Sequence, residues 1–340
     1  MSLRIALDAM GGDHGAPVVV AAAVELLKRH RNVHLILVGD QSTIRKELSN
    51  LGAKESDSLS IHHCTQVVAM DELPSVALRS KKDSSMRVAI DLVKKGEAQA
   101  CVSAGNTGAL MATARFVLKM LPGIDRPAIC TALPTMRGHC HMLDLGANID
   151  SGPEALFQFG LMGSILASAV DGIDRPTVGL LNIGEEEIKG SEYIKEAAKL
   201  LEQSDINYYG FVEGDDIYKG TVDVVVSDGF VGNVALKTSE GIARMVKQFL
   251  KEAFTSSLRG KLSAVVAKPV LRAFGNRIDP GRYNGASLVG LQGIVVKSHG
   301  NTDAKAFANA IDVAIKEVDK DVPQRIAKEL ESMVVERQAV

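Results

Sequence analysis

Five glycine-rich turns of this 340-residue chain carry the residue types that could do chemistry. The first, Asp-Ala-Met-Gly-Gly-Asp-His-Gly at 8–15, joins an apolar run to a predicted helix. Gly11 and Gly12 permit a close approach of the backbone to an anion, and the helix N-terminus behind them favours negative charge. Asp8 and His14 could orient such a ligand or move a proton. A tight turn without a ligand is the structural alternative, and a metal site built from its acidic residues and histidine matches no familiar ligand spacing.

The second turn, Ser-Ala-Gly-Asn-Thr-Gly at 103–108, has the composition of a phosphate or oxyanion cradle. The hydroxyls of Ser103 and Thr107, the amide of Asn106 and the backbone N–H groups before the next helix are suited to bind anionic oxygens. The turn lacks the Gly-Lys-Ser/Thr of a P-loop and the Gly-x-Gly-x-x-Gly of a dinucleotide fold. A helix cap formed by Asn106 is the alternative interpretation.

The third and fourth turns add amides and a lysine. Asn148 ends the turn at 144–148, where local turn bonding is the alternative to ligand binding. Asn182 and Lys189 belong to the turn at 180–191, which leads into a predicted helix. A compact cation at this point could meet a phosphate or a developing oxyanion.

The fifth turn, Ser-Asp-Gly-Phe-Val-Gly-Asn at 227–233, precedes a long predicted helix. Asp228 could accept a proton, and Asn233 could donate a hydrogen bond to a carbonyl oxygen. The alternative is that both residues only cap the helix. Each turn is a weak signal by itself, whereas five polar turns at the ends of apolar runs favour a ligand site.

Short apolar runs alternate with segments of helical period along the chain, and the region at 259–285 is the least regular. Runs such as 222–226 are almost continuously apolar, as parallel strands covered on both faces require. The alternation predicts an α/β fold with a doubly wound, mostly parallel sheet. Because ligands bind beyond the carboxyl ends of parallel strands, we expect the five turns to meet at one edge of the sheet, around one anionic ligand.

Composition and charge narrow the class of protein. Hydrophobic residues make up 46% of the chain, enough for a large core, and the net charge of −2 gives no overall attraction to nucleic acid. The four cysteines have no paired spacing and are expected to be reduced, and the N-terminus has no signal-peptide layout, so we expect a cytoplasmic protein. The longest uncharged stretch, 155–170, predicts a buried helix rather than a membrane span.

The interval 244–277 is strongly basic, with eight basic residues and one acidic residue. We expect a single domain over 1–340 with a protruding basic amphipathic helical segment at about 240–280. Three interpretations stay open: contact with an anionic membrane surface, a landing patch for an acidic carrier protein, or a dimer interface. The apolar and basic residues that alternate at helical spacing are Leu258, Leu262, Val265, Val266, Lys268, Val270, Arg272 and Phe274.

His139 and His141 alternate along one predicted strand and therefore share a face. A zinc site needs more ligands than these two side chains provide. Hydrogen-bonded strand histidines are therefore the preferred interpretation.

Taken together, the motifs resemble one family, the phosphate acyltransferases, which are the acyl-ACP:phosphate transacylases of bacterial phospholipid synthesis. The resemblance runs from residue 5 to about residue 307. The motifs that carry it are DAMGGDHG at 8–15, SAGNTGA at 103–109, LNIGEE at 181–186, VSDGFVGN at 226–233, YNGA at 283–286 and SHG at 298–300.

The resemblance implies a three-layer α/β/α fold similar to phosphotransacetylase and to isocitrate and isopropylmalate dehydrogenases, in a homodimer with a cleft. It implies no cofactor and no metal. It also implies acyl carrier protein as acyl donor and inorganic phosphate as acceptor. The acyl phosphate product would pass to a membrane glycerol-3-phosphate acyltransferase, so we expect peripheral association with the inner face of the cell membrane.

Phosphate is already a nucleophile near neutral pH, so this reaction needs no covalent enzyme intermediate, and no Gly-x-Ser-x-Gly nucleophile motif is present. It needs N–H donors, helix termini and a cation that hold phosphate beside the oxyanion. We therefore expect catalytic roles for Lys189, Asn233, Asp228 and His14. Residues expected to bind phosphate or substrate are Asp8, Gly11, Gly12, Ser103, Asn106, Thr107, Asn148 and Asn182.

Two other functions remain open at this stage. Fold kinship alone suggests an NAD-dependent decarboxylating dehydrogenase of the isopropylmalate type, although no convincing dinucleotide fingerprint or set of metal-binding aspartates is present. A non-catalytic membrane scaffold for lipid synthesis is the other, and it leaves the cluster of polar turns unexplained.

Overall fold

The computed structural model describes residues 3–339, with the side chains at 276, 278, 280 and 333–339 outside the description. Its strands are β1 (Leu3–Asp8), β2 (Val33–Gly39), β3 (Leu59–His63), β4 (Ala100–Ser103), β5 (Ala128–Thr135), β6 (Gly138–Leu143), β7 (Val178–Leu181), β8 (Tyr208–Val212), β9 (Val224–Val226), β10 (Ala286–Val289) and β11 (Ile294–Lys297). Its helices are α1 (Ala16–Leu27), α2 (Gln41–Asn50), α3 (Pro74–Ser80), α4 (Ser85–Lys94), α5 (Thr107–Leu118), α6 (Pro153–Asp171), α7 (Glu192–Glu202), α8 (Asp216–Lys219), α9 (Gly229–Thr255), α10 (Leu258–Ile278), the 3-10 turn η1 (Pro280–Tyr283), α11 (Ala304–Asp319) and α12 (Val322–Ala339).

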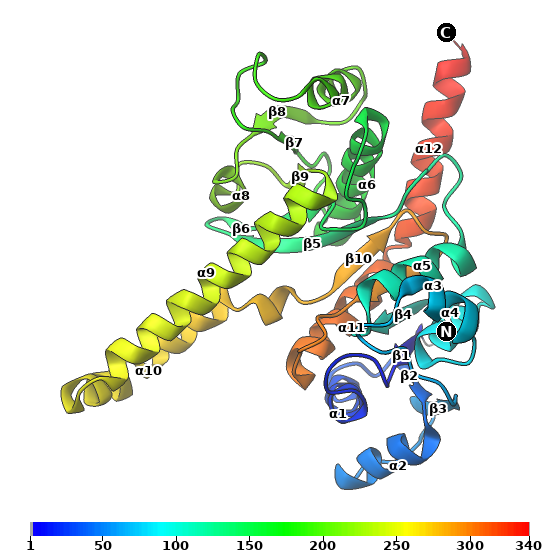
Figure 1. The fold of residues 1–340 in the computed structure, drawn as a ribbon, viewed down its shortest axis with the longest axis vertical. Helices are drawn as coiled ribbons and strands as arrows, with labels where there is room; N and C mark the ends of the chain where they lie inside the picture. The colour runs from blue at the N-terminus through cyan, green and yellow to red at the C-terminus, as the bar shows by residue number, and fades with distance from the viewer. Residues whose placement is uncertain (1–2, 340) are drawn as a thin grey trace.

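All eleven strands form one sheet, in the order β3-β2-β1-β4-β11-β10-β5-β6-β9-β7-β8. The strands from β3 to β11 are parallel to one another, and so are those from β6 to β8. The expected α/β fold with a large, mostly parallel sheet is thus confirmed. Figure 1 shows the two parallel blocks as separate lobes joined through β10 and β5.

The two parallel blocks run in opposite directions, because three successive antiparallel pairings separate them: β11 with β10, β10 with β5, and β5 with β6. Their carboxyl ends therefore lie at opposite edges of the sheet. The expectation that all five turns meet at one edge is wrong for this reason. An antiparallel reversal in the middle of a sheet leaves no trace in the alternation of strands and helices.

Helices cover both faces of the first block, as a three-layer fold requires. On β1, Ile5 and Leu7 face the side packed by α1, α2 and α11, whereas Ala6 faces the side packed by α4 and α5. Successive strand residues point to opposite faces, so the run Ile-Ala-Leu supplies apolar contacts to both layers.

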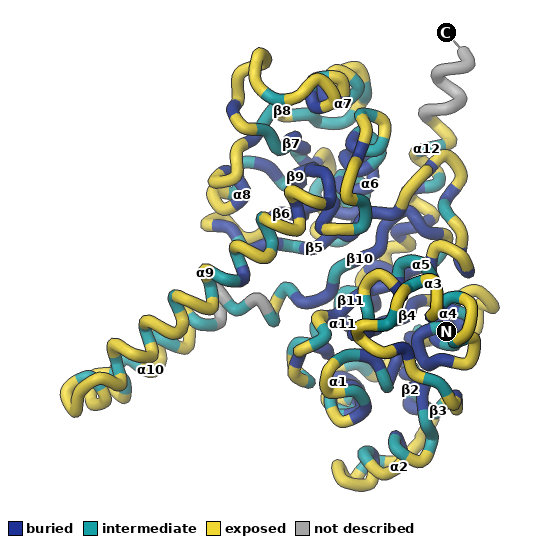
Figure 2. Tube along the Cα trace, viewed as in Figure 1, coloured by how far each residue is buried: buried dark blue, intermediate teal, exposed yellow. Residues whose placement is uncertain are grey.

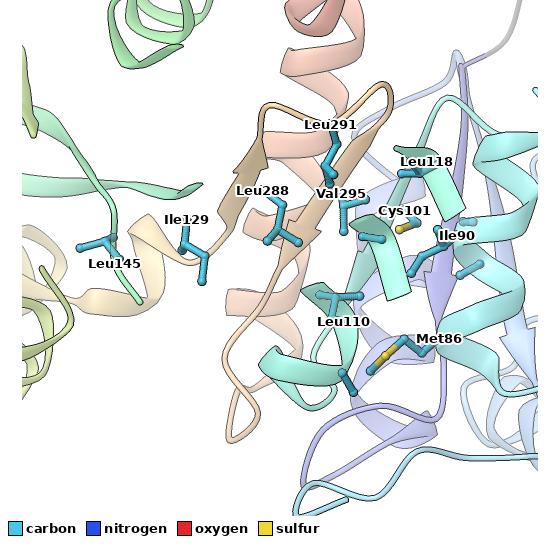
Figure 3. Close-up of a cluster of buried hydrophobic side chains, with 14 of the residues drawn as sticks. Met86, Ile90, Cys101, Leu110, Leu118, Ile129, Leu145, Leu288, Leu291 and Val295 are labelled. Carbon is cyan, nitrogen blue, oxygen red and sulfur yellow. The ribbon is translucent and has the colours of Figure 1, made fainter. Parts of the chain in front are cut away.

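One hydrophobic cluster runs through the middle of the sheet and links the lobes. It extends from Ile90 of α4 through Leu288 of β10 and Ile129 of β5 to Leu145, which follows β6 (Figure 3). The lobes therefore share a core on this face.

Helix α6 is long and apolar enough to cross a membrane by length and composition, and half of its apolar window is buried inside the protein. Leu156, Phe159 and Met162 of this helix are fully enclosed in the core of the second lobe. As expected from the sequence, the segment is a buried core helix.

Helices α9 and α10 pack against each other and project away from the sheet (Figure 1). The region expected to be least regular is therefore helical as far as Ile278, despite Pro269 inside α10. Most of α10 is exposed along its length (Figure 2). Its apolar residues Leu258, Leu262, Val265, Val266 and Val270 are at least 70% exposed, and Phe274 is 41% exposed.

Candidate active site

The loops that follow β1, β4 and β11 meet at one polar site. A Cβ at Gly11 would lie 2.4 Å from Asp8 Oδ2 and 2.9 Å from the Gly105 nitrogen. Gly12 has a φ of 87°, and a Cβ there would lie 3.0 Å from the Gly300 oxygen. The next backbone N–H donates a 2.9 Å hydrogen bond to the same Gly300 oxygen. Both glycines are therefore required because the three loops approach each other so closely.

Asp8 is buried at the base of these loops. Its Oδ2 accepts a 2.6 Å hydrogen bond from Ser103 Oγ, which itself accepts a 3.0 Å bond from the Gly105 N–H. Burial raises the pKa of Asp8, although hydrogen bonds from Ser103 and Ser85 oppose this shift. The Asp8–Ser103 pair thus joins β1 to β4 and fixes the geometry of both turns.

The buried cation of this site is Lys297, a residue that no motif had marked. Its Nζ donates hydrogen bonds to the carbonyl oxygen of Ala104, at 3.4 Å, and to that of Ser298. Among the described residues, no carboxylate lies within ion-pair distance of this ammonium. Burial lowers the pKa of Lys297 to about 8, although the negative charges of Asp8 and Asp13 oppose this shift. A buried cation without a counter-ion is an electrostatic site for an anion.

The loop after β11 is also tied to α9 across the junction between the lobes. Asn284 accepts a 3.0 Å hydrogen bond from the His299 N–H and donates a 2.8 Å bond to Ser298 Oγ. On α9, the buried carboxylate of Glu240 lies 3.5 Å from His299 Nε2 and 3.2 Å from Lys237 Nζ. Burial lowers the pKa of His299, while Glu240 acts to raise it. These charged groups connect the two lobes beside Lys297.

The second lobe has its own polar cluster, around the fully buried Asp144. Its Oδ1 accepts a 2.9 Å hydrogen bond from the Ile129 N–H, and its Oδ2 accepts bonds from the N–H and the side-chain amide of Asn148, at 2.7 and 3.0 Å. Burial raises the pKa of Asp144 despite these bonds. The Asn148 amide also donates to the Pro127 oxygen at 2.8 Å, so both of its protons serve the turn.

A cavity of about 820 Å³ lies between α9, β5 and the loop after β11. Its lining is mostly apolar, with side chains from β5 and α9 such as Leu133 and Leu236. Thr107 and Lys297 reach it from the first lobe, and Asn233 reaches it from the second. Residues from strand blocks of opposite direction therefore share one cavity, although not one edge of the sheet.

Lys189 and Asn182 lie elsewhere, in the loop after β7. The Lys189 side chain is 45% exposed, and its ammonium pairs with Glu186 at 3.1 Å. The Asn182 amide donates to the carbonyl oxygens of Gly184, at 3.1 Å, and Lys189, at 3.2 Å. Neither side chain lines the cavity. The structure brings these two residues together, outside the lining of the cavity that Asn233 and Thr107 reach.

Of three further residues expected in the site, two cap helices and the third contacts the loop after β11. Asn106 caps α5, where its Oδ1 accepts a 3.0 Å hydrogen bond from the Ala109 N–H. Asp228 caps α9 by accepting a 2.9 Å bond from the N–H three residues later. His14 is exposed, and its Nε2 lies 2.9 Å from Asn301 Oδ1. In this structure Asn106 and Asp228 have the capping contacts that were the structural alternative.

The position of Lys297 in the sequence already marks it. The segment 286–297 forms the antiparallel pair β10 and β11. Lys297 is therefore the last residue of a parallel strand and precedes Ser298-His299-Gly300. The rule that drew attention to the other strand ends applies here too, because Lys297 ends an apolar run directly before a polar turn.

Comparisons with known proteins agree with this architecture. A family model described as a fatty acid synthesis protein matches residues 3–325. A phosphate acyltransferase from Nitrosococcus oceani is 61% identical over 340 residues, all of both chains. A phosphate acyltransferase from Methylococcus capsulatus is 60% identical over 333 residues, which is 98% of both chains.

Solved structures with much lower identity share the fold. A phosphotransacetylase from Streptococcus pyogenes has a TM-score of 0.63 and 18% identity, over 94% of both chains. A 4-hydroxythreonine-4-phosphate dehydrogenase from Klebsiella pneumoniae has a TM-score of 0.56 and 13% identity, over 94% of this chain and all of the other. Because the high identity to the acyltransferases extends along the full chain, the protein belongs to the phosphate acyltransferase family of enzymes.

Proposed function

We propose that this enzyme transfers a fatty acyl group from acyl carrier protein to inorganic phosphate, and so supplies acyl phosphate for phosphatidic acid and phospholipid synthesis. The observation that carries the proposal is the cavity that combines an apolar lining with the ammonium of Lys297 and the amide of Asn233. Its volume of about 820 Å³ lies in the range of roughly 300–1,000 Å³ that small-molecule sites occupy. The apolar lining suits an aliphatic chain, and the buried ammonium suits phosphate.

In this reaction a phosphate oxygen attacks the thioester carbonyl carbon, and a C–O bond forms. The carbonyl electron pair moves onto oxygen to give a tetrahedral oxyanion. Collapse of the intermediate breaks the C–S bond, and the carrier thiolate leaves and takes up a proton. Two negatively charged groups must lie side by side, so positive charge and N–H donors are the main requirement.

The site offers such groups from both lobes. We propose that Lys297, the hydroxyl of Thr107 and the backbone N–H of Gly12 hold phosphate, whereas the Gly11 N–H donates to the Asp8 carboxylate. The amide of Asn233 would donate to the developing oxyanion from the opposite side of the cavity. Lys189 would add a second cation only if the loop at 182–191 closes over the cavity, because its ammonium now pairs with Glu186 on the surface.

The proposed partners follow from the reaction and from the projecting helices. The basic, apolar surface of α10 would contact an anionic membrane, which would place the enzyme in the cytoplasm at the inner face of the cell membrane. There the acyl phosphate could pass to a membrane glycerol-3-phosphate acyltransferase. The acidic acyl carrier protein would bind the same basic residues of α10. In a homodimer, the partner chain would cover part of α9 and α10.

The dehydrogenase alternative rests on a likeness at 13% identity, which concerns the fold alone. The alternative of a non-catalytic scaffold is set aside, because the chain belongs to a family of enzymes. The decisive assay incubates the enzyme with acylated carrier protein and measures release of the free thiol with and without inorganic phosphate. Release that requires phosphate supports the proposal, and release at equal rates in its absence contradicts it.

A further inference from the structure

A cluster outside the acyltransferase cavity joins β6 to the end of α6. The ring nitrogens of His139 and His141 lie 3.0 and 2.7 Å from the same carboxylate oxygen of Asp171. The two imidazole rings stand almost perpendicular, at 82°, with their centroids 5.4 Å apart. They do not stack, and each directs its Nε2 to one common point.

The cluster uses the face of β6 that points away from the cavity. Cys140, between the two histidines, points to the opposite face and belongs to the core beneath α9, with Ala235 and Leu236 packed against it. Leu143, on the histidine side, packs in the core with α6. Because alternate strand residues face opposite sides, the histidines lie on the side of β6 opposite Cys140, although the His139 ring lies 6.4 Å from the ring of Tyr283, which lines the cavity.

The three side chains have the chemistry and spacing of a metal site. Their ligand atoms all lie within 4.8 Å of one another. Around a tetrahedral zinc ion with bonds of about 2.0–2.2 Å, ligand atoms lie roughly 3.3–3.6 Å apart. To reach this geometry the Asp171 oxygen would have to move away from the two ring nitrogens, which lie 3.0 and 2.7 Å from it, and the ring nitrogens would have to take the same spacing from each other. The partly exposed side chains of His139 and Asp171 leave a path for an ion.

We infer that His139, His141 and Asp171 form a binding site for a divalent transition metal ion of the zinc type. Two imidazoles and one carboxylate form a donor set that binds ions of the zinc type in preference to magnesium and calcium. Water would complete the coordination. The ion would fasten the C-terminal end of α6 to β6, so its role is structural.

The test uses the full-length chain without a histidine tag, freed of metal with a chelator. Titration with Zn²⁺ is followed by calorimetry, and titration with Co²⁺ by the visible absorption of the tetrahedral ion. We expect saturation at one ion per chain and a rise in melting temperature. The variant H139A/H141A should lose at least about tenfold in affinity, the lower range seen even for outer-sphere changes.

The matched control is H62A/H63A, which removes two adjacent histidines from the strand β3 in the other lobe. It should bind Zn²⁺ as the unmodified protein does. If H139A/H141A does not fold, the variant H139Q keeps an amide that can donate to Asp171 and should still lose affinity. Equal Zn²⁺ affinity in the unmodified protein and a folded His139 variant would overturn the proposal, as would the absence of saturable binding.

Discussion

The Nζ atom of Lys297 lies 3.4 Å from the carbonyl oxygen of Ala104, so an ammonium that has no carboxylate partner among the described residues faces the backbone of the turn after β4. This relationship joins the carboxyl ends of β4 and β11 by a charge that an anionic substrate can neutralise. We therefore expect the activity to depend on whether Lys297 is charged.

Replacement of Lys297 by methionine should lower kcat/KM on the order of 100-fold, as loss of one oxyanion-stabilising group does. Burial lowers the pKa of Lys297 to about 8. The ammonium is charged below that pH, so activity should fall as the pH rises through about 8. A pH–rate profile of phosphate-dependent thiol release would measure both effects.

The variant K297R is the control for this pH limit, because arginine stays charged to pH values above about 12. The variant should keep part of the activity. Its rate should stay constant at the pH values above about 8 where the rate of the unmodified enzyme declines. Identical alkaline limits in the two proteins would exclude Lys297 as the titrating group.

Asn233 should contribute directly to turnover, because it lines the cavity from the second lobe. The variant N233A is expected to lower kcat roughly 100-fold with the fold intact, through loss of a hydrogen-bond donor to the oxyanion. The same measurement on K189A tests the loop at 182–191. A comparable loss would mean that the Lys189 ammonium reaches the reacting atoms, and near-wild-type rates in both variants would reject both assignments.

Gly232 should tolerate no side chain. A Cβ at this position would lie 1.9 Å from the backbone oxygen of Asp144, and neither backbone can move without disturbing the buried turn. We expect G232A to lower the free energy of unfolding by about 1–3 kcal/mol or more, measured by denaturant titration.

Gly241 lies on the same helix, and a Cβ there would have no neighbour within 4 Å. Since alanine favours the helix over glycine, G241A should stabilise the protein by about 0.5–1 kcal/mol. Equal effects of the two substitutions would contradict the close approach of α9 to the Asp144 turn.

Glu317 should make stability depend on pH. This carboxyl group of α11 is buried, with a hydrogen bond from Ser287, and burial raises its pKa from 4.5 to about 7. The folded protein therefore holds this proton more tightly than the unfolded chain, so stability is full below pH 4.5 and is lost as the pH rises toward 7. Between pH 4.5 and about 7, E317Q should avoid a loss of up to about 3 kcal/mol in the free energy of unfolding.

Denaturant titrations of both proteins at several pH values would test this expectation. The difference in unfolding free energy between E317Q and the unmodified protein should increase in favour of the variant from pH 4.5 to about 7. A difference that stays constant over this interval would show that Glu317 is not responsible.

The exposed apolar residues of α10 should be needed for membrane contact. The variant V265E/V266E places two charges where the side chains are 70% and 79% exposed, and should abolish flotation with anionic lipid vesicles. I183E/I188E is the matched control, because these isoleucines are 78% and 84% exposed in a different loop. Unchanged flotation of V265E/V266E would remove the membrane proposal.

Local features of this protein follow from the sequence by itself. Continuous apolar runs, helix-starting turns and paired glycines predicted the α/β class, most strands and the polar turns after β1 and β4, because these features depend on backbone conformation and side-chain polarity within a few residues. The helical spacing of Leu258, Leu262 and Val266 predicted the face of α10 in the same way.

The tertiary structure alone decided which of these turns share a site. The reversals at β10, β5 and β6 send the two strand blocks in opposite directions, and no local pattern encodes the order in which distant strands pair. The same pairing buries Lys297 beside Ala104, 193 residues away, while Lys189 stays on the surface. Burial and charge pairing arise from contacts between remote segments, so only the folded chain shows which of the two lysines is buried at the cavity.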